Sequence, residues 1–333
     1  MAQAPTEFEG SAQKRQGSAI GASRKRAIEC EGASNGALLR FWGERLWGRH
    51  RDELGRLKVA DAAVAKAAKM VANAEKAIAK RKTELEILFA EPNETIRLYK
   101  VDGVWTDDRK ELHRKIVSSF FEGKTPVDDP VFYVLGGGPA SGKTYVLREK
   151  SKVVRPPANT VEVDVDEIKK MLPEYREGVL LGVERAAGYV HEESSELSKI
   201  IMQIANEKGY NILLDGTGDG SVASITKKIQ DAKKAGHRVE GYYATVPTEL
   251  ALEREAKRAK ESGRKVKREV VVGTHKKVSD ILPQVADQFD VVYLYDTTDG
   301  AVLIATGGNG SGLIPVEGKE ADLQRFIDKA NDD

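Results

Sequence analysis

A chain of 333 residues has room for one large domain or two smaller ones, and its 40% hydrophobic content is typical of a globular protein. Its 53 basic and 52 acidic residues leave a formal net charge of +1, which argues against nucleic acid as a partner. No apolar run approaches the length of a membrane span, and the lone Cys30 excludes an intramolecular disulfide. We therefore expect no membrane segment, no secretion signal and a cytoplasmic location.

The N-terminal third is predicted to differ from the rest of the chain. Residues 1–34 are rich in Ser, Gly and charge and are expected to be disordered. Residues 35–125 are expected to form a mainly helical region. Within it, apolar side chains recur at every seventh position from Leu57 to Leu85, on a long helix predicted over residues 51–91. This spacing indicates either a homo-oligomeric or partner-binding helix, or a helix packed on the body of its own chain.

A small hairpin and a further helix are predicted before the main domain. Residues 95–105 have the pattern of a hairpin that turns at Asp102 and Gly103. A helix is then expected from residue 107 to about residue 121, with an acidic first turn. The rest of the chain, residues 126–333, is predicted to form one domain.

In this domain, apolar runs of strand length alternate with helical stretches. Such alternation is typical of a doubly wound parallel sheet with helices on both faces. Together with the GxxxxGK[ST] pattern at residues 137–144, this alternation predicts a P-loop NTPase-like α/β domain behind a mainly helical N-terminal extension. Strands are expected at residues 131–135, 160–164, 210–215, 238–245 and 290–295, helices at 179–207, 221–235 and 248–262, a hairpin at 301–316, and a last helix near 319–330.

A glycine-rich loop follows the first of these strands. Residues 137–144 read GGPASGKT, which is the GxxxxGK[ST] pattern of a phosphate-binding loop in its usual place between a strand and a helix. Lys143 supplies a charge for the terminal phosphates, and Thr144 a hydroxyl for Mg²⁺. The sequence predicts a site for ATP or GTP with Mg²⁺. Its binding residues are Gly137, Gly138, Pro139, Ala140, Ser141, Gly142, Lys143, Thr144 and Tyr145.

Polar residues follow the next two strands at their carboxyl ends, where open parallel sheets bind ligands. Asp164 and Asp166 follow the second strand, and Asp215 and Thr217 follow the third. Phosphoryl transfer needs a positioned proton acceptor, so one of the first two carboxylates is expected to serve, and Asp164 is expected to contact Mg²⁺ through water. A solvated turn is the alternative interpretation of the pair. For Asp215 two roles stay open, acceptor binding and indirect Mg²⁺ binding.

The ordered set of these motifs resembles the zeta toxin family of P-loop kinases over about residues 130–298. The resemblance rests on the loop and on residues 163–166, 209–218 and 246–247, together with Arg258 and Arg268. It implies transfer of the γ-phosphate of ATP or GTP to a hydroxyl of a nucleotide-sugar such as UDP-N-acetylglucosamine, with toxicity as the outcome. It also raises the question of a neutralising antitoxin protein.

The resemblance further implies roles for single residues. Asp166 matches the base that accepts the proton of the attacking hydroxyl, and the two arginines match those that stabilise charge on the transferred phosphoryl group. A solvated basic helix is the other interpretation of the arginine segment. The catalytic residues expected are Lys143, Asp166, Arg258 and Arg268. The residues expected to bind the acceptor are Asp166, Glu196, Lys199, Asp215 and Thr217.

Two other interpretations stay open. One is the same transfer to a different acceptor, such as the ribose of NAD or a hydroxyl of an antibiotic. The other is a non-kinase nucleotide-binding assembly protein that uses the long helix to bind partners. Asp166 distinguishes them, because a protein that only binds or hydrolyses a nucleotide has no use for a base aimed at an acceptor hydroxyl.

Overall fold

The computed structural model describes residues 57–91, 94–147, 156–262 and 266–331. Its contacts divide the chain into two compact units, Met1–Ile87 and Leu88–Asp333. The described part of the first unit is one long helix, α3 (Leu57–Leu88), as the heptad spacing predicts. The disorder expected for residues 1–34 lies outside the described residues, and oligomerisation through the long helix stays a prediction.

The second unit begins with a helical turn that the sequence does not predict. Helix α4 (Glu94–Tyr99) takes up half of the predicted hairpin, which shrinks to β1 (Lys100–Val101) and β2 (Val104–Trp105). The prediction is wrong for residues 95–99 because tertiary contacts override the alternating pattern. The buried hydroxyl of Thr95, for example, donates to the carbonyl oxygen of Tyr189 at 3.3 Å. The turn itself is confirmed, with positive φ at Asp102 and Gly103.

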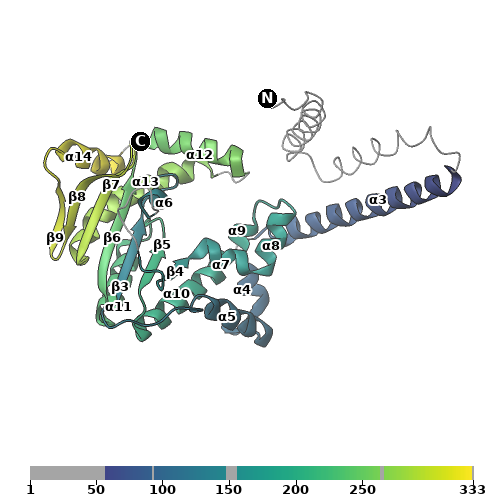
Figure 1. The fold of residues 1–333 in the computed structure, drawn as a ribbon, viewed down its shortest axis with the longest axis horizontal. Coiled ribbons are helices and arrows are strands. Elements are labelled where there is room, and N and C mark those ends of the chain that lie inside the picture. Colours follow the sequence, from purple (N-terminus) through teal and green to yellow (C-terminus); the bar gives the residue numbers. More distant parts are fainter. Residues whose placement is uncertain (1–56, 92–93, 148–155, 263–265, 332–333) are drawn as a thin grey trace, which may run out of the picture. The chain divides into compact units, whose positions relative to one another are not determined.

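A seven-stranded sheet forms the centre of this unit, with strand order β4-β5-β3-β6-β7-β8-β9 (Figure 1). Strands β3 to β7 pair in parallel, and β8 and β9 extend the sheet in the antiparallel sense. This arrangement confirms the predicted α/β fold. The strands are β3 (Val131–Gly136), β4 (Val161–Asp164), β5 (Ile212–Asp215), β6 (Arg238–Thr245), β7 (Val291–Asp296), β8 (Val302–Gly308) and β9 (Ser311–Pro315).

The helices of this unit are α5 (Asp107–Ser119), α6 (Lys143–Leu147), α7 (Val165–Met171), α8 (Pro173–Leu180), α9 (Ala186–Tyr189), α10 (His191–Lys208), α11 (Val222–Lys234), α12 (Thr248–Ser262), α13 (Arg268–Val285) and α14 (Glu320–Asp328). Short 3₁₀ turns cover Ala286–Gln288 and Lys329–Asn331. No helix in the described ranges is long and apolar enough to cross a bilayer.

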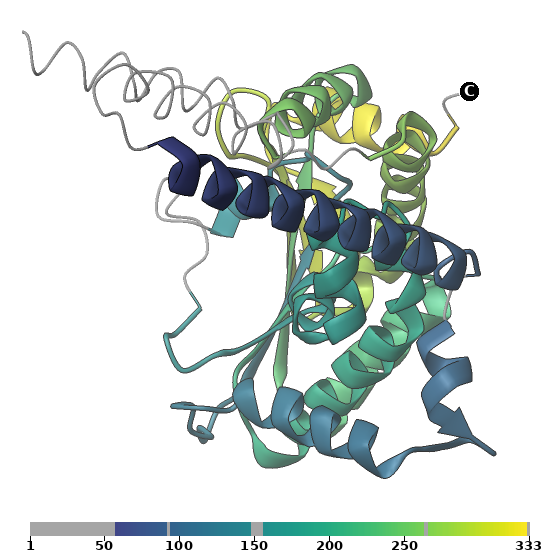
Figure 2. The same cartoon turned by 90° about the vertical axis from the view of Figure 1, so that its right-hand side faces the viewer.

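Strand order decides which face each helix covers. The connection from β3 to β4 crosses the sheet in one direction, and those leading to β5, β6 and β7 run the other way. Right-handed crossovers therefore place α6 on one face and α10, α11 and α13 on the other. Figure 2 shows the strands almost edge on, with teal and green helices gathered on one side. Side chains follow this division, since Val146 of α6 packs with Ala244 and Tyr295.

Two helical predictions need correction. The stretch predicted as one helix over residues 179–207 is interrupted, because Gly182 adopts φ +66° after α8 and the chain makes the short helix α9 before α10. Helix α13 was not predicted from the sequence, although its buried side chains recur at helical spacing. These residues include Val271, Thr274, His275, Val278 and Leu282. The packing of α13 brings it against the phosphate-binding loop.

Candidate active site

The loop between β3 and α6 has the backbone of an anion cradle. Gly137 and Gly142 adopt φ +133° and +89°, and Ala140 adopts φ +58°. Left-handed residues within such a loop turn successive N–H groups toward one point, where an anion binds. Because Ala140 has a Cβ, its left-handed conformation costs about 1 to 2 kcal/mol. The surrounding contacts must therefore hold the loop in this shape.

Lys143 is the first residue of α6, and its side chain lies across the loop. Its Nζ donates to the carbonyl oxygens of Gly137 and Gly138, at 2.8 and 3.3 Å. Burial lowers the pKa of Lys143, and the negative charge of Asp215 acts in the opposite direction. The ammonium group is thus placed between the loop and the carboxylates at the strand ends, where terminal phosphates of a nucleotide would lie.

A second contact ties the loop to the segment after β7. The hydroxyl of Thr297 donates to the carbonyl oxygen of Ser141 at 2.6 Å, and a Cβ on Gly142 would lie 2.5 Å from the same hydroxyl. Arg254 of α12 in turn donates to the hydroxyl of Thr297 at 3.3 Å and to its carbonyl oxygen at 2.9 Å. The sequence analysis did not single out Thr297, because nothing in its local pattern reveals a partner 156 positions away.

These residues border a small pocket beside the loop. It has a volume of about 290 Å³ and is lined by Gly142, Tyr145, Arg254, Thr297, Thr298 and Gly300. Its position next to the cradle makes it a suitable place for the non-phosphate part of a nucleotide.

Carboxylates from two neighbouring strands meet at the same edge of the sheet. Asp164, the last residue of β4, pairs in register with Asp215, the last residue of β5. The Oδ1 atom of Asp164 accepts the backbone N–H of Asp166 at 2.8 Å, so Asp164 caps α7. Burial raises the pKa of both Asp164 and Asp215. The structure thus brings together the strand-end carboxylates that the sequence predicts.

Asp166 projects from the first turn of α7. Its Oδ1 accepts a hydrogen bond from Lys169 at 3.0 Å, and the Lys169 side chain is mostly buried. The buried ammonium group restricts the orientation of the Asp166 carboxylate. Lys169 was not singled out from the sequence, although its spacing of three residues on a short helix is typical of such a pair.

Of the other predicted acceptor residues, Thr217 is joined directly to the loop. Its carbonyl oxygen accepts the N–H of Gly137 at 2.8 Å, and its hydroxyl donates to Asp219. Glu196 has a different environment. Its carboxylate accepts hydrogen bonds from Lys100 at 2.7 Å and from the indole of Trp105 at 3.2 Å, so it helps to hold the β1–β2 hairpin. A role for Glu196 in acceptor binding stays a prediction.

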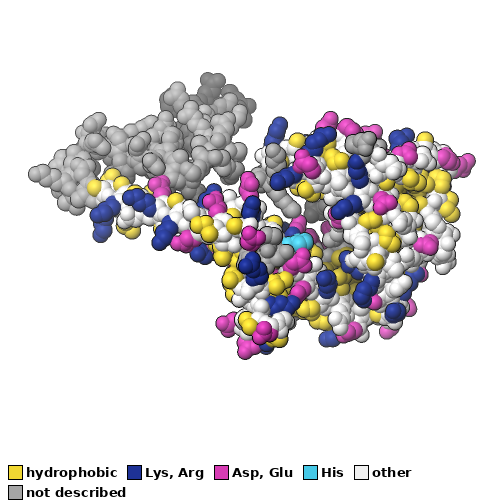
Figure 3. All heavy atoms as spheres, turned by 180° about the vertical axis from the view of Figure 1, so that it is seen from behind, with side chains coloured by type: hydrophobic (Ala, Val, Ile, Leu, Met, Phe, Trp, Pro, Cys, Tyr) yellow, Lys and Arg dark blue, Asp and Glu magenta, His cyan; other side chains and the backbone are white. Residues whose placement is uncertain are grey.

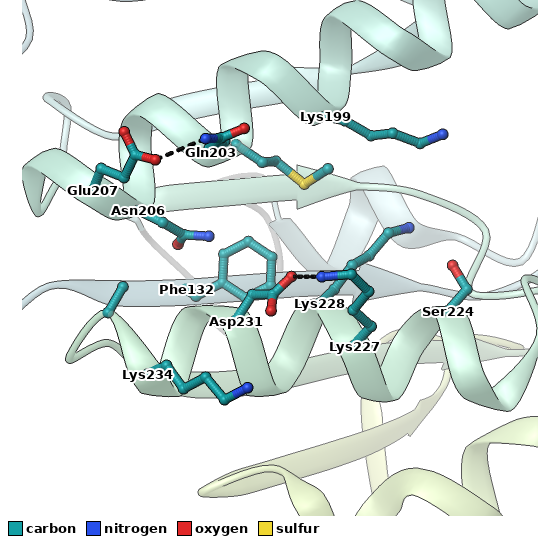
Figure 4. Close-up of a pocket in the computed structure, with 12 residues that line it drawn as sticks. Phe132, Lys199, Gln203, Asn206, Glu207, Ser224, Lys227, Lys228, Asp231 and Lys234 are labelled. Atoms are coloured by element: carbon teal, nitrogen blue, oxygen red, sulfur yellow. Dashed lines mark hydrogen bonds and ion pairs between the residues drawn. The ribbon is translucent and has the colours of Figure 1, made fainter.

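Lys199 lines a groove of about 830 Å³ between α10 and α11, with Phe132 of β3 at its floor (Figure 4). Lys228 of α11 extends into the same groove. Burial lowers the pKa of Lys228, and the positive charge of Lys199 lowers it further, whereas Asp219 opposes the shift. Among the described residues, neither lysine forms a salt bridge. Glu207 and Asp231 also line this groove, and acceptor binding by Lys199 stays a prediction.

The two arginines predicted to stabilise charge on the transferred phosphoryl group lie on consecutive helices. Arg258 of α12 forms an ion pair with the buried carboxylate of Glu255 and is close enough to lower the pKa of Lys143. Arg268 is exposed in the first turn of α13. Figure 3 shows basic and acidic side chains intermixed over this face, the α12 end included. The structure thus places Arg258 within electrostatic reach of the loop lysine.

The donor set also fits Mg²⁺ bound together with a nucleotide. In the described ranges, no group of three or more His, Cys, Asp or Glu side chains could hold a metal by itself. Mg²⁺ in nucleotide sites takes most of its ligands from phosphate oxygens and water, and needs few from protein. The exposed hydroxyl of Thr144, with the half-buried carboxylates of Asp164 and Asp215 nearby, suits that arrangement.

A mostly parallel sheet with this loop after its first strand, and with carboxylates at the ends of the adjoining strands, defines a P-loop nucleotide-binding protein. The family model described as zeta toxin matches residues 118–309, which is more than half of the chain. The chain therefore belongs to the zeta toxin family.

Individual relatives match over shorter regions. Toxin zeta of Enterococcus hirae is 30% identical over 127 residues, covering 38% of this chain and 43% of the relative. Toxin zeta of Streptococcus agalactiae is 32% identical over 112 residues, covering 34% and 37%. The chain thus spans less than half the length of these relatives. The crystal structure of the AvrRxo1-ORF1:-ORF2 complex has a similar fold, with a TM-score of 0.54 and 20% identity over 68% of this chain and 74% of that one.

Proposed function

We propose that this protein is a Mg²⁺-dependent kinase that transfers the γ-phosphate of ATP or GTP to a hydroxyl of a nucleotide-sugar such as UDP-N-acetylglucosamine, and that this transfer makes it a toxin. The proposal rests mainly on the carboxylate of Asp166. Lys169 holds this carboxylate at the edge of the sheet where the phosphate-binding loop and Lys143 also lie. Membership of the zeta toxin family supports it. The AvrRxo1-ORF1:-ORF2 structure with ATP, at a TM-score of 0.51, supports ATP as donor.

In the proposed reaction, the loop N–H groups bind the donor phosphates, and Lys143 exchanges its two carbonyl partners for oxygens of the terminal phosphates. The acceptor hydroxyl attacks the γ-phosphorus, the bond from that phosphorus to the bridging β–γ oxygen breaks, and Asp166 takes the hydroxyl proton. The nucleoside diphosphate leaves. Mg²⁺, which Thr144 would help to hold, supplies charge neutralisation on the phosphates.

Arg258 and Arg268 complete the proposed transfer site from α12 and α13. Their guanidinium groups would stabilise the charge that develops on the transferred phosphoryl group. On the acceptor side, Asp215, Thr217 and Lys199 line the space beyond Asp166 in the proposal. A neutralising protein partner is part of the same proposal, in keeping with the toxin relatives.

The test measures ADP formation with Mg·ATP and a panel of acceptors: UDP-N-acetylglucosamine, NAD and an aminoglycoside. We expect the UDP-sugar to stimulate turnover. Asp166→Asn should lower the stimulated rate by about 10² to 10⁴, because a general base is lost, and should leave the affinity for Mg·ATP unchanged. Glu167→Gln is the matched control. Its carboxylate is exposed on the same helix and pairs with Lys170, so its loss should not alter the rate.

If NAD or the antibiotic stimulates turnover instead, the acceptor is not a nucleotide-sugar, but the proposed phosphoryl transfer still holds. If no acceptor stimulates turnover and Asp166→Asn behaves like Glu167→Gln, the kinase proposal is wrong and a nucleotide-binding assembly protein becomes the better interpretation.

A further inference from the structure

His275, on the helix that the sequence analysis missed, packs directly on the phosphate-binding loop. Its side chain is buried, and its Nε2 lies 2.9 Å from the carbonyl oxygen of Pro139. A carbonyl oxygen only accepts, so Nε2 must carry a proton and donate. The contact joins the middle of α13 to the middle of the loop.

The imidazole ring also explains one of the loop glycines. A Cβ on Gly138 would lie 2.5 Å from Nε2 of His275, well inside van der Waals contact. Gly138 is not among the residues with positive φ, so its backbone conformation alone does not require glycine. The requirement comes from the close approach of the histidine ring, which occupies the space of a side chain at this position.

The direction of this hydrogen bond matters for anion binding. No cis peptide bond occurs in the described part of the chain, so the C=O of Pro139 and the N–H of Ala140 point in opposite directions across one peptide plane. A carbonyl turned toward α13 therefore turns the N–H of Ala140 away from α13. The same bond braces Ala140, the non-glycine residue that the loop holds at φ +58°.

The ring makes this contact as a neutral group. Burial lowers the pKa of His275 to about 4, and the nearby positive charges of Lys329 and Lys143 act in the same direction, while the bond to Pro139 opposes them. At pH 6 to 8 the imidazole is uncharged. Its effect on the loop is thus a directional hydrogen bond and not an electrostatic attraction for phosphate.

We propose that His275 is a positioning residue for the nucleotide donor, and that it presets the phosphate-binding shape of the loop by donating from Nε2 to the carbonyl oxygen of Pro139. This inference rests on the proposed nucleotide site but does not depend on the acceptor. If only a fraction of the molecules has the loop in its phosphate-binding shape, the apparent affinity for the nucleotide is the intrinsic affinity multiplied by that fraction.

The experiment is calorimetric titration of the full chain with Mg·ATP and, separately, with inorganic triphosphate. His275→Leu keeps the apolar bulk and removes the donor, so the carbonyl oxygen of half-buried Pro139 loses this hydrogen bond. We expect it to weaken the binding of both probes about tenfold. His275→Gln can still donate through its amide and should recover most of the loss. The acceptor KM should be unchanged in both variants.

His237 provides a matched control. It is also buried and also bonds a backbone carbonyl, that of Tyr210 at 2.8 Å, but it lies just before β6, at the opposite end of the strands from the loop. His237→Leu should lower the thermal midpoint without changing the affinity for either probe. A purely structural role for His275 would make His275→Leu behave in the same way.

The pH dependence gives a second readout. Because the ring is neutral, the ratio of dissociation constants between His275→Gln and the wild type should stay constant from pH 5.5 to 8. A ratio that rises as the pH falls would show that a charged imidazolium binds phosphate, and would overturn the proposal. So would unchanged triphosphate binding by folded His275→Leu and His275→Gln. Failure of the wild type to bind Mg·ATP would overturn the proposed function as well.

Discussion

Replacing Arg109 by methionine is expected to destabilise the second unit by about 3 to 5 kcal/mol, because it removes the guanidinium group that pairs with a buried carboxylate. Arg109 of α5 donates to Glu193 of α10 through Nε at 2.6 Å and Nη2 at 2.7 Å, and to both oxygens of Glu174 at 2.9 Å. Its guanidinium carbon also lies 4.2 Å from the centre of the Tyr99 ring. The side chains of Arg109 and Glu193 are 6% and 0% exposed, so water cannot replace the lost contacts.

Urea unfolding followed by circular dichroism measures this change. At about 2 to 4 °C per kcal/mol for a unit of this size, the thermal midpoint should fall by about 6 to 20 °C. The double variant Arg109→Met with Glu193→Met should recover part of the loss, since it removes the fully buried carboxylate and leaves only Glu174 without the arginine. Arg114→Met is the control, because that side chain is 71% exposed on the same helix and its ion pair contributes about 0 to 1 kcal/mol.

The same pair predicts a pH dependence. Burial raises the pKa of Glu193, but the hydrogen bonds from His113 and Arg109 outweigh burial, and the net pKa is lowered. A carboxylate whose pKa is lower in the folded state stabilises the protein above the unfolded-state value, about 4.3, and loses this effect as the pH falls through the folded-state value. The gap in stability between wild type and Arg109→Met should therefore narrow below about pH 4. A gap under about 1 kcal/mol at pH 7, or one that widens in acid, would refute the reasoning.

Two further predictions concern the loop and the groove. Gly138→Ala should weaken Mg·ATP binding at least about tenfold, because the added Cβ meets His275, whereas Gly188→Ala in α9, where nothing lies within 4 Å, should not; equal titration curves would contradict this. Lys228→Met should raise the urea midpoint at pH 7, because burial and Lys199 lower the pKa of Lys228 and so make its charged form less favourable in the folded state. Lys234→Met, exposed on the same helix, is the control, and a lower midpoint for Lys228→Met would disprove the argument.

The features predicted correctly from the sequence are those whose cause is local. Short apolar runs followed by aspartate or glycine mark β3, β4 and β5, and the loop between β3 and α6 has a fixed pattern of glycine, lysine and threonine. Parallel strands end at the same edge of a sheet, so the residues after them could be expected to meet. Asp164 and Asp215 do meet there, in register.

The features that were missed depend on residues far apart in the chain. The segment 270–272 is a run of three valines, typical of a strand, yet it begins a buried helix because its apolar side chains continue at helical spacing. His275 lies on that apolar stripe, and this position is the sequence feature that points to a buried histidine. Its contact with Pro139, 136 positions away, appears only once the crossovers have placed α13 over the loop. The contact between Arg109 of α5 and Glu193 of α10 likewise joins residues 84 positions apart and appears only in the folded structure.

The two sides of the proposed site are held in different ways. On the donor side, buried groups from α13 and from the segment after β7 hold two loop carbonyls, and Lys143 from α6 engages two more. Such a cradle admits little variation, because each contact also fixes a glycine. On the proposed acceptor side, α10 and α11 border a groove in which Lys199 and Lys228 have no salt bridge among the described residues. None of the contacts that hold the cradle involves these two lysines, so we expect substitutions in the groove to leave the shape of the loop unchanged.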